Sequence, residues 1–164
     1  MSRKFDWGHI NINVSDLDAS IAFYSKLGFE VFLPGIPYLN LAAGEPSVIP
    51  DHACDALRLP AGTTGRACIV QLGDGFPKLD LTELPGLAQR DPLANKDRGL
   101  VRICLISQDL AADYEALTAE GVRFLTAPQP CHERLADVAT CVDPDGTLIE
   151  LLQVYLERWG PYIG

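Results

Sequence analysis

The feature that most constrains this sequence is an internal repeat, because a strand, a helix and then three strands occur twice along its 164 residues. In residues 8–14 apolar side chains alternate with polar ones, which predicts a strand with one buried face. Residues 17–27 carry apolar side chains at helical spacing, and Gly28 after them is typical of a helix end. Residues 29–33 are predicted to form the next strand.

The same order returns in the second half of the chain. A helix that begins after Asp109 lies between two predicted strands, and a pair of strands closes each half. The strands of the second half are residues 100–106, 122–125, 138–142 and 147–152, and the closing pair of the first half is residues 67–72 and 78–82. The repeat predicts two similar supersecondary units.

Aligning the two copies assigns equivalent positions. Asp16 and Asp109 open the two helices, 93 positions apart, whereas Asp80 and Glu150 lie in the last strands, 70 positions apart. The difference of 23 residues falls in the first copy, at about residues 34–65, where five prolines occur. We predict a long loop there, with residues 38–41 as a candidate short strand. Long loops of this kind often form a wall or lid of a binding site.

The predicted domain organisation follows from this alignment. Residues 1–84 form a first module that carries the insert, residues 85–97 form a linker, and residues 98–164 form a second module with a C-terminal tail.

The charge of the chain argues against nucleic-acid and membrane partners. Lys and Arg number 13 against 22 Asp and Glu, a net charge of −9, so the clustered positive charge that both partners need is missing. No apolar run approaches the ~20 residues of a membrane span, and no secretory signal is expected. The five cysteines form no C-x-x-C pair, which fits small buried hydrophobes in a reducing cytoplasm.

Several segments together resemble the vicinal oxygen chelate superfamily, which includes glyoxalase I, extradiol dioxygenases, methylmalonyl-CoA epimerase and the fosfomycin and bleomycin resistance proteins. The resemblance runs from Gly8 to Leu152. It is carried by residues 8–20, Phe23-Tyr24, residues 27–31, residues 109–112, Glu120-Gly121-Val122, residues 142–146 and residues 149–151.

The resemblance implies an α+β fold, in which two tandem βαβββ modules form an incomplete barrel around a central cavity. It also implies a divalent metal held by the first and last strands of each module, at the positions of His9, Asp80, Arg102 and Glu150. The alternation of each strand independently places these side chains opposite its apolar face. One imidazole and two carboxylates, from His9, Asp80 and Glu150, suit iron, manganese, zinc or nickel.

Arg102 departs from the pattern of the family, because a guanidinium has no free lone pair with which to bind a metal. Two alternatives stay open. Arg102 binds a carboxylate or phosphate of the substrate and leaves a three-residue metal site, or it pairs with Asp80 and Glu150 and replaces the charge of the metal.

We therefore expect a metal-using lyase, isomerase or dioxygenase that acts on a small organic molecule with adjacent oxygen atoms. Glu150 and His132 are the candidate catalytic residues, His132 as a general base at the cavity mouth or, alternatively, as a solvent-exposed loop residue. Arg102, Asn11 and Asn13 are candidates for substrate binding. The alternative function is a metal-free protein that binds a drug or metabolite, and by analogy with the family the chain forms a homodimer.

Overall fold

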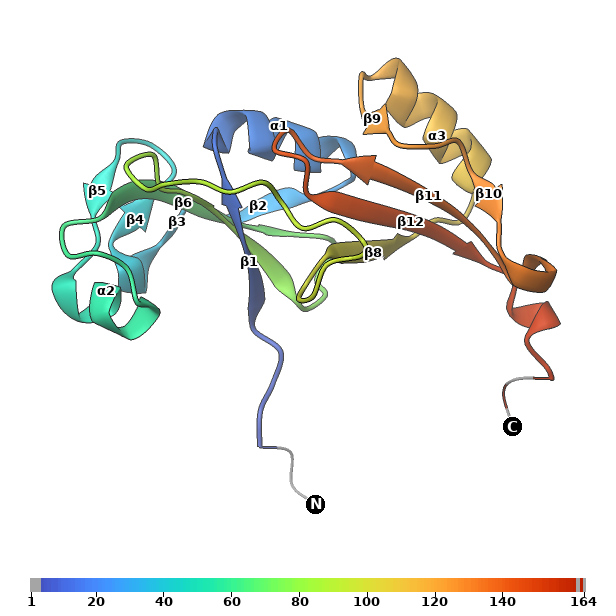
Figure 1. Cartoon of the computed structure of the whole chain (residues 1–164), viewed down its shortest axis with the longest axis horizontal. Coiled ribbons are helices and arrows are strands. Elements are labelled where there is room, and N and C mark those ends of the chain that lie inside the picture. The colour runs from blue at the N-terminus through green and yellow to red at the C-terminus, as the bar shows by residue number, and fades with distance from the viewer. Residues whose placement is uncertain (1–3, 162, 164) are drawn as a thin grey trace. The chain divides into compact units, whose positions relative to one another are not determined.

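The computed structural model describes residues 4–161 and residue 163, and the chain divides into two compact units, Met1–Gln89 and Arg90–Gly164. Each unit contains one five-stranded sheet with a ten-residue helix packed on it (Figure 1). Neither sheet closes into a barrel by itself.

In the first unit the strand order is β1-β7-β6-β2, and β5 also pairs with β6. The first and last strands of the module along the chain, β1 and β7, are parallel neighbours, whereas the other pairs are antiparallel. Helix α1 (Leu17–Lys26) covers one face and buries Leu17 and Tyr24 completely. The strands are β1 (His9–Val14), β2 (Glu30–Leu33), β5 (Ser47–Val48), β6 (Thr64–Gln71) and β7 (Lys78–Glu83).

The second unit repeats this arrangement. Strands β8 and β12 are parallel neighbours, β11 follows β12, and both β9 and β10 pair with β11. Helix α3 (Leu110–Ala119) packs against β11 and β12. The remaining elements are β8 (Arg102–Ile106), β9 (Arg123–Phe124), β10 (Gln129–Pro130), β11 (Ala136–Val142), β12 (Leu148–Val154) and the 3₁₀ turns η2 (His132–Arg134) and η3 (Leu156–Arg158). The predicted fold class, α+β with two tandem βαβββ modules, is confirmed.

Helices α1 and α3 begin with the same capping interaction. The carboxylate of Asp16 accepts a hydrogen bond from the backbone N–H of Ala19 at 2.9 Å, and Asp109 does the same for Ala112 at 3.1 Å. An aspartate at this position satisfies one of the backbone donors that a helix leaves unpaired at its start.

A residue of the last strand also caps each helix. Glu83 accepts a hydrogen bond from the backbone N–H of Leu17 at 2.7 Å, and Gln153 accepts one from Leu110 at 2.9 Å. Glu83 and Gln153 lie 70 positions apart, the same offset that relates Asp80 to Glu150 in the alignment. The two units therefore share this contact between helix and sheet, which we call the joint, as well as the order of elements.

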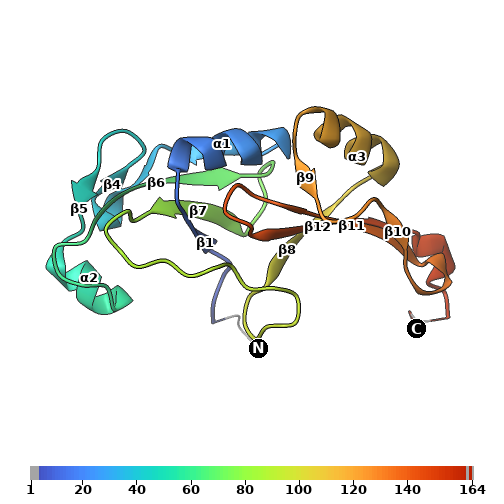
Figure 2. The same cartoon turned by 45° about the horizontal axis from the view of Figure 1, so that its top comes forward.

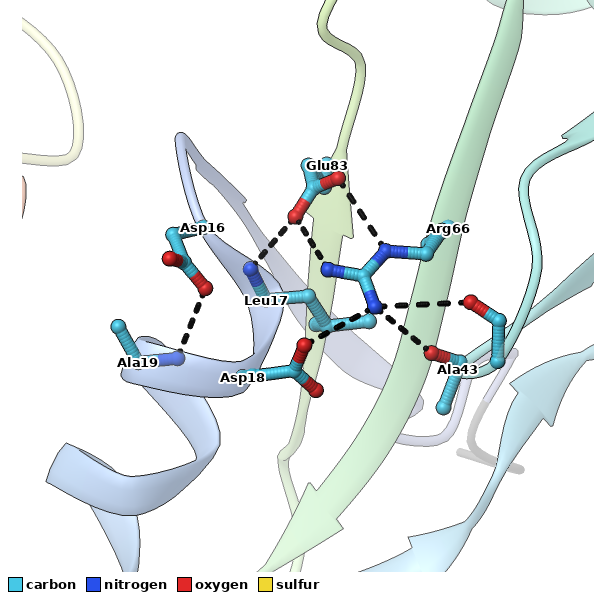
Figure 3. Close-up of polar contacts among 8 residues, drawn as sticks. Asp16, Leu17, Asp18, Ala19, Ala43, Arg66 and Glu83 are labelled. Carbon is cyan, nitrogen blue, oxygen red and sulfur yellow. Dashed lines mark hydrogen bonds and ion pairs between the residues drawn. The ribbon is translucent and has the colours of Figure 1, made fainter.

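In the first unit this joint contains an ion-pair network around Arg66 (Figure 3). The guanidinium contacts Glu83 at 2.9 Å and Asp18 of α1 at 3.1 Å, and it donates to the backbone carbonyls of Ala43 and Gly44. Hydrogen bonding to Arg66 is the main reason that the pKa of Glu83 lies below its usual value. Arg66 thereby contacts α1, the sheet and the insert at the same time.

The insert of the first unit is folded, so the predicted long loop is wrong. A hairpin of β3 (Gly35–Ile36) and β4 (Leu41–Ala42) encloses the 3₁₀ turn η1 (Pro37–Leu39), and α2 (Asp51–Leu57) follows β5. Of the candidate strand at residues 38–41, residues 38–39 belong to the 3₁₀ turn and only Leu41 lies in a strand. The insert folds because its apolar side chains form a core with the sheet, made by Ile36, Leu41, Ile49, Ala53, Cys54, Ala67 and Leu84.

Helices α1 and α2 lie on opposite sides of the first sheet (Figure 2). No helix in the described part of the chain is both long enough and apolar enough to cross a bilayer.

We expect Arg66→Met to destabilise the protein by about 1–3 kcal/mol, because it leaves the half-buried carboxylate of Glu83 without its cation. Chemical denaturation followed by circular dichroism measures the change. The double variant Arg66→Met/Glu83→Gln should recover much of the loss, since glutamine performs the equivalent capping in the second unit. Equal stability of the single variant and the wild type would contradict the anchoring role of Arg66.

Candidate functional site

The face of the first sheet opposite α1 carries a group of polar side chains, which we call the polar face. The parallel register of β1 and β7 sets Asn11 opposite Asp80, so side chains on alternate positions of both strands share this face. The polar face contains His9, Asn11 and Asn13 of β1 and Lys78, Asp80 and Thr82 of β7.

His9 and Asp80 form the central contact of the polar face. The imidazole Nε2 lies 3.2 Å from Asp80 Oδ2, and the imidazole is 42% exposed whereas Asp80 is only 1% exposed. The other carboxylate oxygen, Oδ1, is buried and has no hydrogen-bond partner among the described residues. Burial raises the pKa of Asp80 and the nearby His9 opposes that rise. An unsatisfied buried carboxylate oxygen is costly, so Asp80 Oδ1 is a candidate to bind a cation or to accept a hydrogen bond.

Asn11 and Asn13 lie beside this pair and are connected to Thr82. The Thr82 hydroxyl donates to Asn11 Oδ1 at 2.8 Å, and Asn11 Nδ2 donates to Asn13 Oδ1 at 2.9 Å. This chain of hydrogen bonds fixes the orientation of both amides and leaves their remaining N–H groups as donors.

Lys78 is a buried cation at one end of the polar face, only 6% exposed. Its ammonium donates to Gln71 Oε1 at 2.7 Å and lies 4.3 Å and 4.4 Å from the ring centres of Phe32 and Phe76. Cation–π contacts and the amide satisfy this charge. The partners of Lys78 are therefore residues other than His9 and Asp80.

The insert borders the other side of Asp80. Ile69 of β6 lies opposite Asp80 in the sheet and packs against the core of the insert. Tyr38 lies in turn η1 of the insert. Burial first, and the Asp80 charge second, raise the pKa of Tyr38.

In the second unit, the equivalent positions hold an ion pair between Arg102 and Glu150. The parallel register sets Cys104 opposite Glu150, so Arg102 is its diagonal neighbour, as His9 is of Asp80. Arg102 Nε donates to Glu150 Oε2, and Nη1 donates to Asn95 at 3.0 Å. The guanidinium therefore supplies the cation that this carboxylate needs.

On strands β8 and β12, the positions of that face that correspond to other residues of the polar face are apolar. Cys104, Ile106 and Leu152 lie where the first sheet has Asn11, Asn13 and Thr82. Ile106 is 57% exposed. The two modules thus present equivalent surfaces of different chemistry, one polar and one apolar with a single ion pair.

His132 lies away from this ion pair. It sits in turn η2 with its side chain 79% exposed, and its Nε2 is 3.6 Å from Glu133. The turn precedes β11, whose first residue pairs with Val154, four positions and about 13 Å along β12 from Glu150. The structure does not bring His132 next to Glu150, and its role as a general base stays a prediction.

The donor chemistry of the first unit fits a divalent ion. An imidazole and a carboxylate that still has an unsatisfied oxygen are a suitable pair of ligands. Within either unit, however, no three described His, Cys, Asp or Glu side chains form a metal cluster. Arg102 cannot serve as a ligand, so of the two equivalent positions in the second unit only Glu150 can bind a metal.

Three residues of these two surfaces were missed in the sequence. Lys78 and Thr82 lie two positions on either side of Asp80, so the same alternation that placed Asp80 could have found them. Asn95 lies in an irregular segment, and no periodicity of the sequence connects it to the strand that it borders.

Comparison with known proteins places these surfaces in a family context. The model of the Glyoxalase/Bleomycin resistance protein/Dioxygenase superfamily matches residues 7–151. A lactoylglutathione lyase of Pseudomonas aeruginosa is 26% identical over 95% of this chain and 86% of that protein. A lactoylglutathione lyase of Schizosaccharomyces pombe is 24% identical over 92% of this chain, which spans 45% of that protein.

Solved structures share the fold. A glyoxalase family protein from Bacillus cereus superposes with a TM-score of 0.71 over 93% of this chain and 96% of its own, at 16% identity. A glyoxalase I variant from Zea mays superposes with a TM-score of 0.59 over 88% of this chain and 43% of its own, at 21% identity.

We expect Asp80→Asn to stabilise the metal-free protein at neutral pH, because the wild type must then hold a buried carboxylate in its charged form. Below the ordinary pKa of aspartate this cost is absent, and it grows as the pH rises through the raised pKa of Asp80. The gap in melting temperature between the two proteins should therefore close toward pH 4. Thermal melts in the presence of a chelator measure it.

Asp74→Asn is the matched control, since Asp74 is exposed in the turn between β6 and β7. A pH-independent gap for Asp80→Asn, or the same gap for both variants, would show that burial of the Asp80 charge does not govern stability.

Proposed function

Because the chain belongs to the Glyoxalase/Bleomycin resistance protein/Dioxygenase superfamily, we propose that it is a glyoxalase-type enzyme that uses a divalent metal to act on a small organic molecule with adjacent oxygen atoms. The observation that carries the proposal is the His9–Asp80 pair, with its buried, unsatisfied carboxylate oxygen on the polar face. The names of the two curated relatives favour a lyase among the reactions that the superfamily covers.

His9 and Asp80 are the residues of the first unit that would hold the metal. When bound, a divalent ion polarises a carbonyl or binds two adjacent oxygens of a substrate. The burial of Asp80 excludes water from one side of this pair, while the exposed imidazole edge of His9 faces the solvent side. The N–H groups left free on Asn11 and Asn13 then bind an oxygen of the substrate.

In the second unit, Glu150 is the candidate for proton transfer. Arg102 holds its Oε2, and Oε1 is left to take a proton from the substrate and return it. Arg102 Nη2 makes no hydrogen bond within the described residues, so it is available to orient an anionic group of the substrate. The earlier prediction that Glu150 is a third metal ligand stays a proposal.

A metal-free binding protein is the second candidate function. The Arg102–Glu150 ion pair favours it, because a guanidinium in place of a ligand neutralises the carboxylate without an ion. In this case the polar face binds a drug or metabolite and no reaction follows. The homodimer and a small-molecule partner are proposals under either candidate.

Metal content separates the two candidates. We expect the wild type, incubated with zinc, manganese, nickel or ferrous iron and then desalted, to retain one ion per chain, because His9 and Asp80 bind it. His9→Ala and Asp80→Asn should lose the ion, and the control His52→Ala, in the exposed part of α2, should keep it. Elemental analysis gives the stoichiometry. A wild type that retains no ion under any of these conditions supports the metal-free binding protein and excludes the metal-dependent enzyme.

Arg102→His tests the second unit. The substitution replaces a group that cannot bind a metal by one that can, so metal affinity should rise by roughly tenfold or more, the scale on which even outer-shell partners act. Competition with a fluorescent chelator measures the dissociation constant. Thioester formation from methylglyoxal and glutathione tests the lyase reaction in the same samples. Unchanged affinity would show that position 102 does not take part in metal binding.

A further inference from the structure

We propose that Asn95 is a positioning residue for Arg102: its side chain fixes the plane of the guanidinium, so that Arg102 pairs with Glu150 and at the same time presents Nη2 to an anionic group of the substrate. The inference rests on the proposed function in taking Arg102 as the residue that orients this group. It gives a role in ligand recognition to the segment between β7 and β8, which the sequence pattern predicts only to be a linker.

The guanidinium of Arg102 is held at two different nitrogens. Nε donates to Glu150 Oε2, and Nη1 donates to Asn95 Oδ1 at 3.0 Å. All five N–H donors of a guanidinium lie in one plane. The contact at Nε alone leaves the group free to turn about that hydrogen bond, whereas the second contact at Nη1 fixes the plane. The N–H groups of Nη2 therefore point in a fixed direction.

Asn95 can hold Arg102 in this way because the loop that carries it is closed. Asp97 Oδ2 accepts a hydrogen bond from the backbone N–H of Ala94 at 2.7 Å, and the backbone N–H of Asp97 donates to the Ala94 carbonyl at 2.9 Å. These two bonds enclose Asn95 in a turn. Leu93 packs on Gly99 at the ends of the loop, since a Cβ at Gly99 would lie 3.1 Å from Leu93 Cδ1. The φ of Gly99, +123°, is one that favours glycine.

The loop is also attached to the sheet of the second unit. Pro92 packs on the turn between β11 and β12, where its Cγ lies 3.7 Å from the position that a Cβ on Gly146 would take. After the loop the chain enters β8, which begins at Arg102. Both ends of the loop are therefore held on the sheet that carries the Arg102–Glu150 pair, and Asn95 reaches Nη1 from a fixed backbone.

The ion pair is accessible from the side of Arg102. The side chain of Arg102 is 43% exposed, whereas that of Glu150 is only 16% exposed, so an anion from solvent meets the guanidinium first. An exposed arginine has much rotamer entropy, which it loses when it binds an anion. Asn95 and Glu150 remove most of this freedom before the ligand arrives, and such preorganisation strengthens binding.

The first measurement follows the guanidinium of Arg102 by nitrogen-15 NMR in chelator-treated protein, so that no metal takes part. Rotation about the Cζ–Nε bond exchanges Nη1 with Nη2 and requires the contact with Asn95 to break. We expect this rotation to be about threefold to fivefold faster in Asn95→Ala than in the wild type, the scale of one exposed charged contact. Asn95→Asp keeps an acceptor oxygen and should not rotate faster than the wild type. The control Gln108→Ala, which removes an exposed amide in the turn before α3, should match the wild type.

The second measurement is a titration of the same samples with two small probes. Pyruvate joins a carboxylate to an adjacent carbonyl, whereas hydroxyacetone is neutral and also has two adjacent oxygens. We expect Asn95→Ala to weaken pyruvate binding by about threefold to fivefold and to leave hydroxyacetone binding unchanged. Gln108→Ala should bind both probes as the wild type does. Thermal melts of both variants should equal that of the wild type, since Asn95 and Gln108 are exposed.

Equal rotation in wild type and Asn95→Ala, faster rotation in Asn95→Asp, no pyruvate binding by the wild type, or equal weakening of both probes would each overturn the role of Asn95. Metal content and thioester formation, measured on metal-loaded samples, report separately on the proposed function. Retained metal and thioester formation with Asn95-independent pyruvate binding keep the proposed function and overturn the inference. Asn95-dependent pyruvate binding by a protein that retains no metal does the reverse.

Discussion

The parallel pairing of the first and last strands of each module determines what this protein can do. This pairing sets Asn11 opposite Asp80 in one sheet and Cys104 opposite Glu150 in the other. The residue two positions earlier on the first strand is then the diagonal neighbour of the acid, close enough for side chains to touch. The backbone thus creates the same two-residue contact twice, and the residue types at these positions decide its chemistry.

The two copies of this contact have diverged. The first holds an imidazole and a buried carboxylate with an unused oxygen, among amides and a hydroxyl. The second holds a guanidinium and a carboxylate that satisfy each other, among apolar side chains. Because a duplicated fold needs the backbone pairing but not any particular pair of side chains, the two copies can carry different chemistry at the same contact.

Much of the fold could be predicted from the sequence, because strand alternation and the helix caps are local signals. The offset of 70 positions that relates Asp80 to Glu150 also relates the structurally equivalent Glu83 and Gln153. The insert could not be predicted in the same way. Its strands are two residues long and its helix has seven, too short to show a periodicity, and it is ordered by non-local packing on Ala67.

The two helix caps on the last strands have a consequence for the behaviour of the protein in acid. Glu83 can be protonated and Gln153 cannot. Since Arg66 holds the pKa of Glu83 below its ordinary value, the contribution of this carboxylate is present at neutral pH and disappears as the pH falls through that lowered pKa. Acidification therefore weakens the contact between α1, the sheet and the insert in the first unit. The equivalent contact of Gln153 in the second unit does not titrate. Of the two copies of this helix–sheet contact, one responds to pH and the other does not.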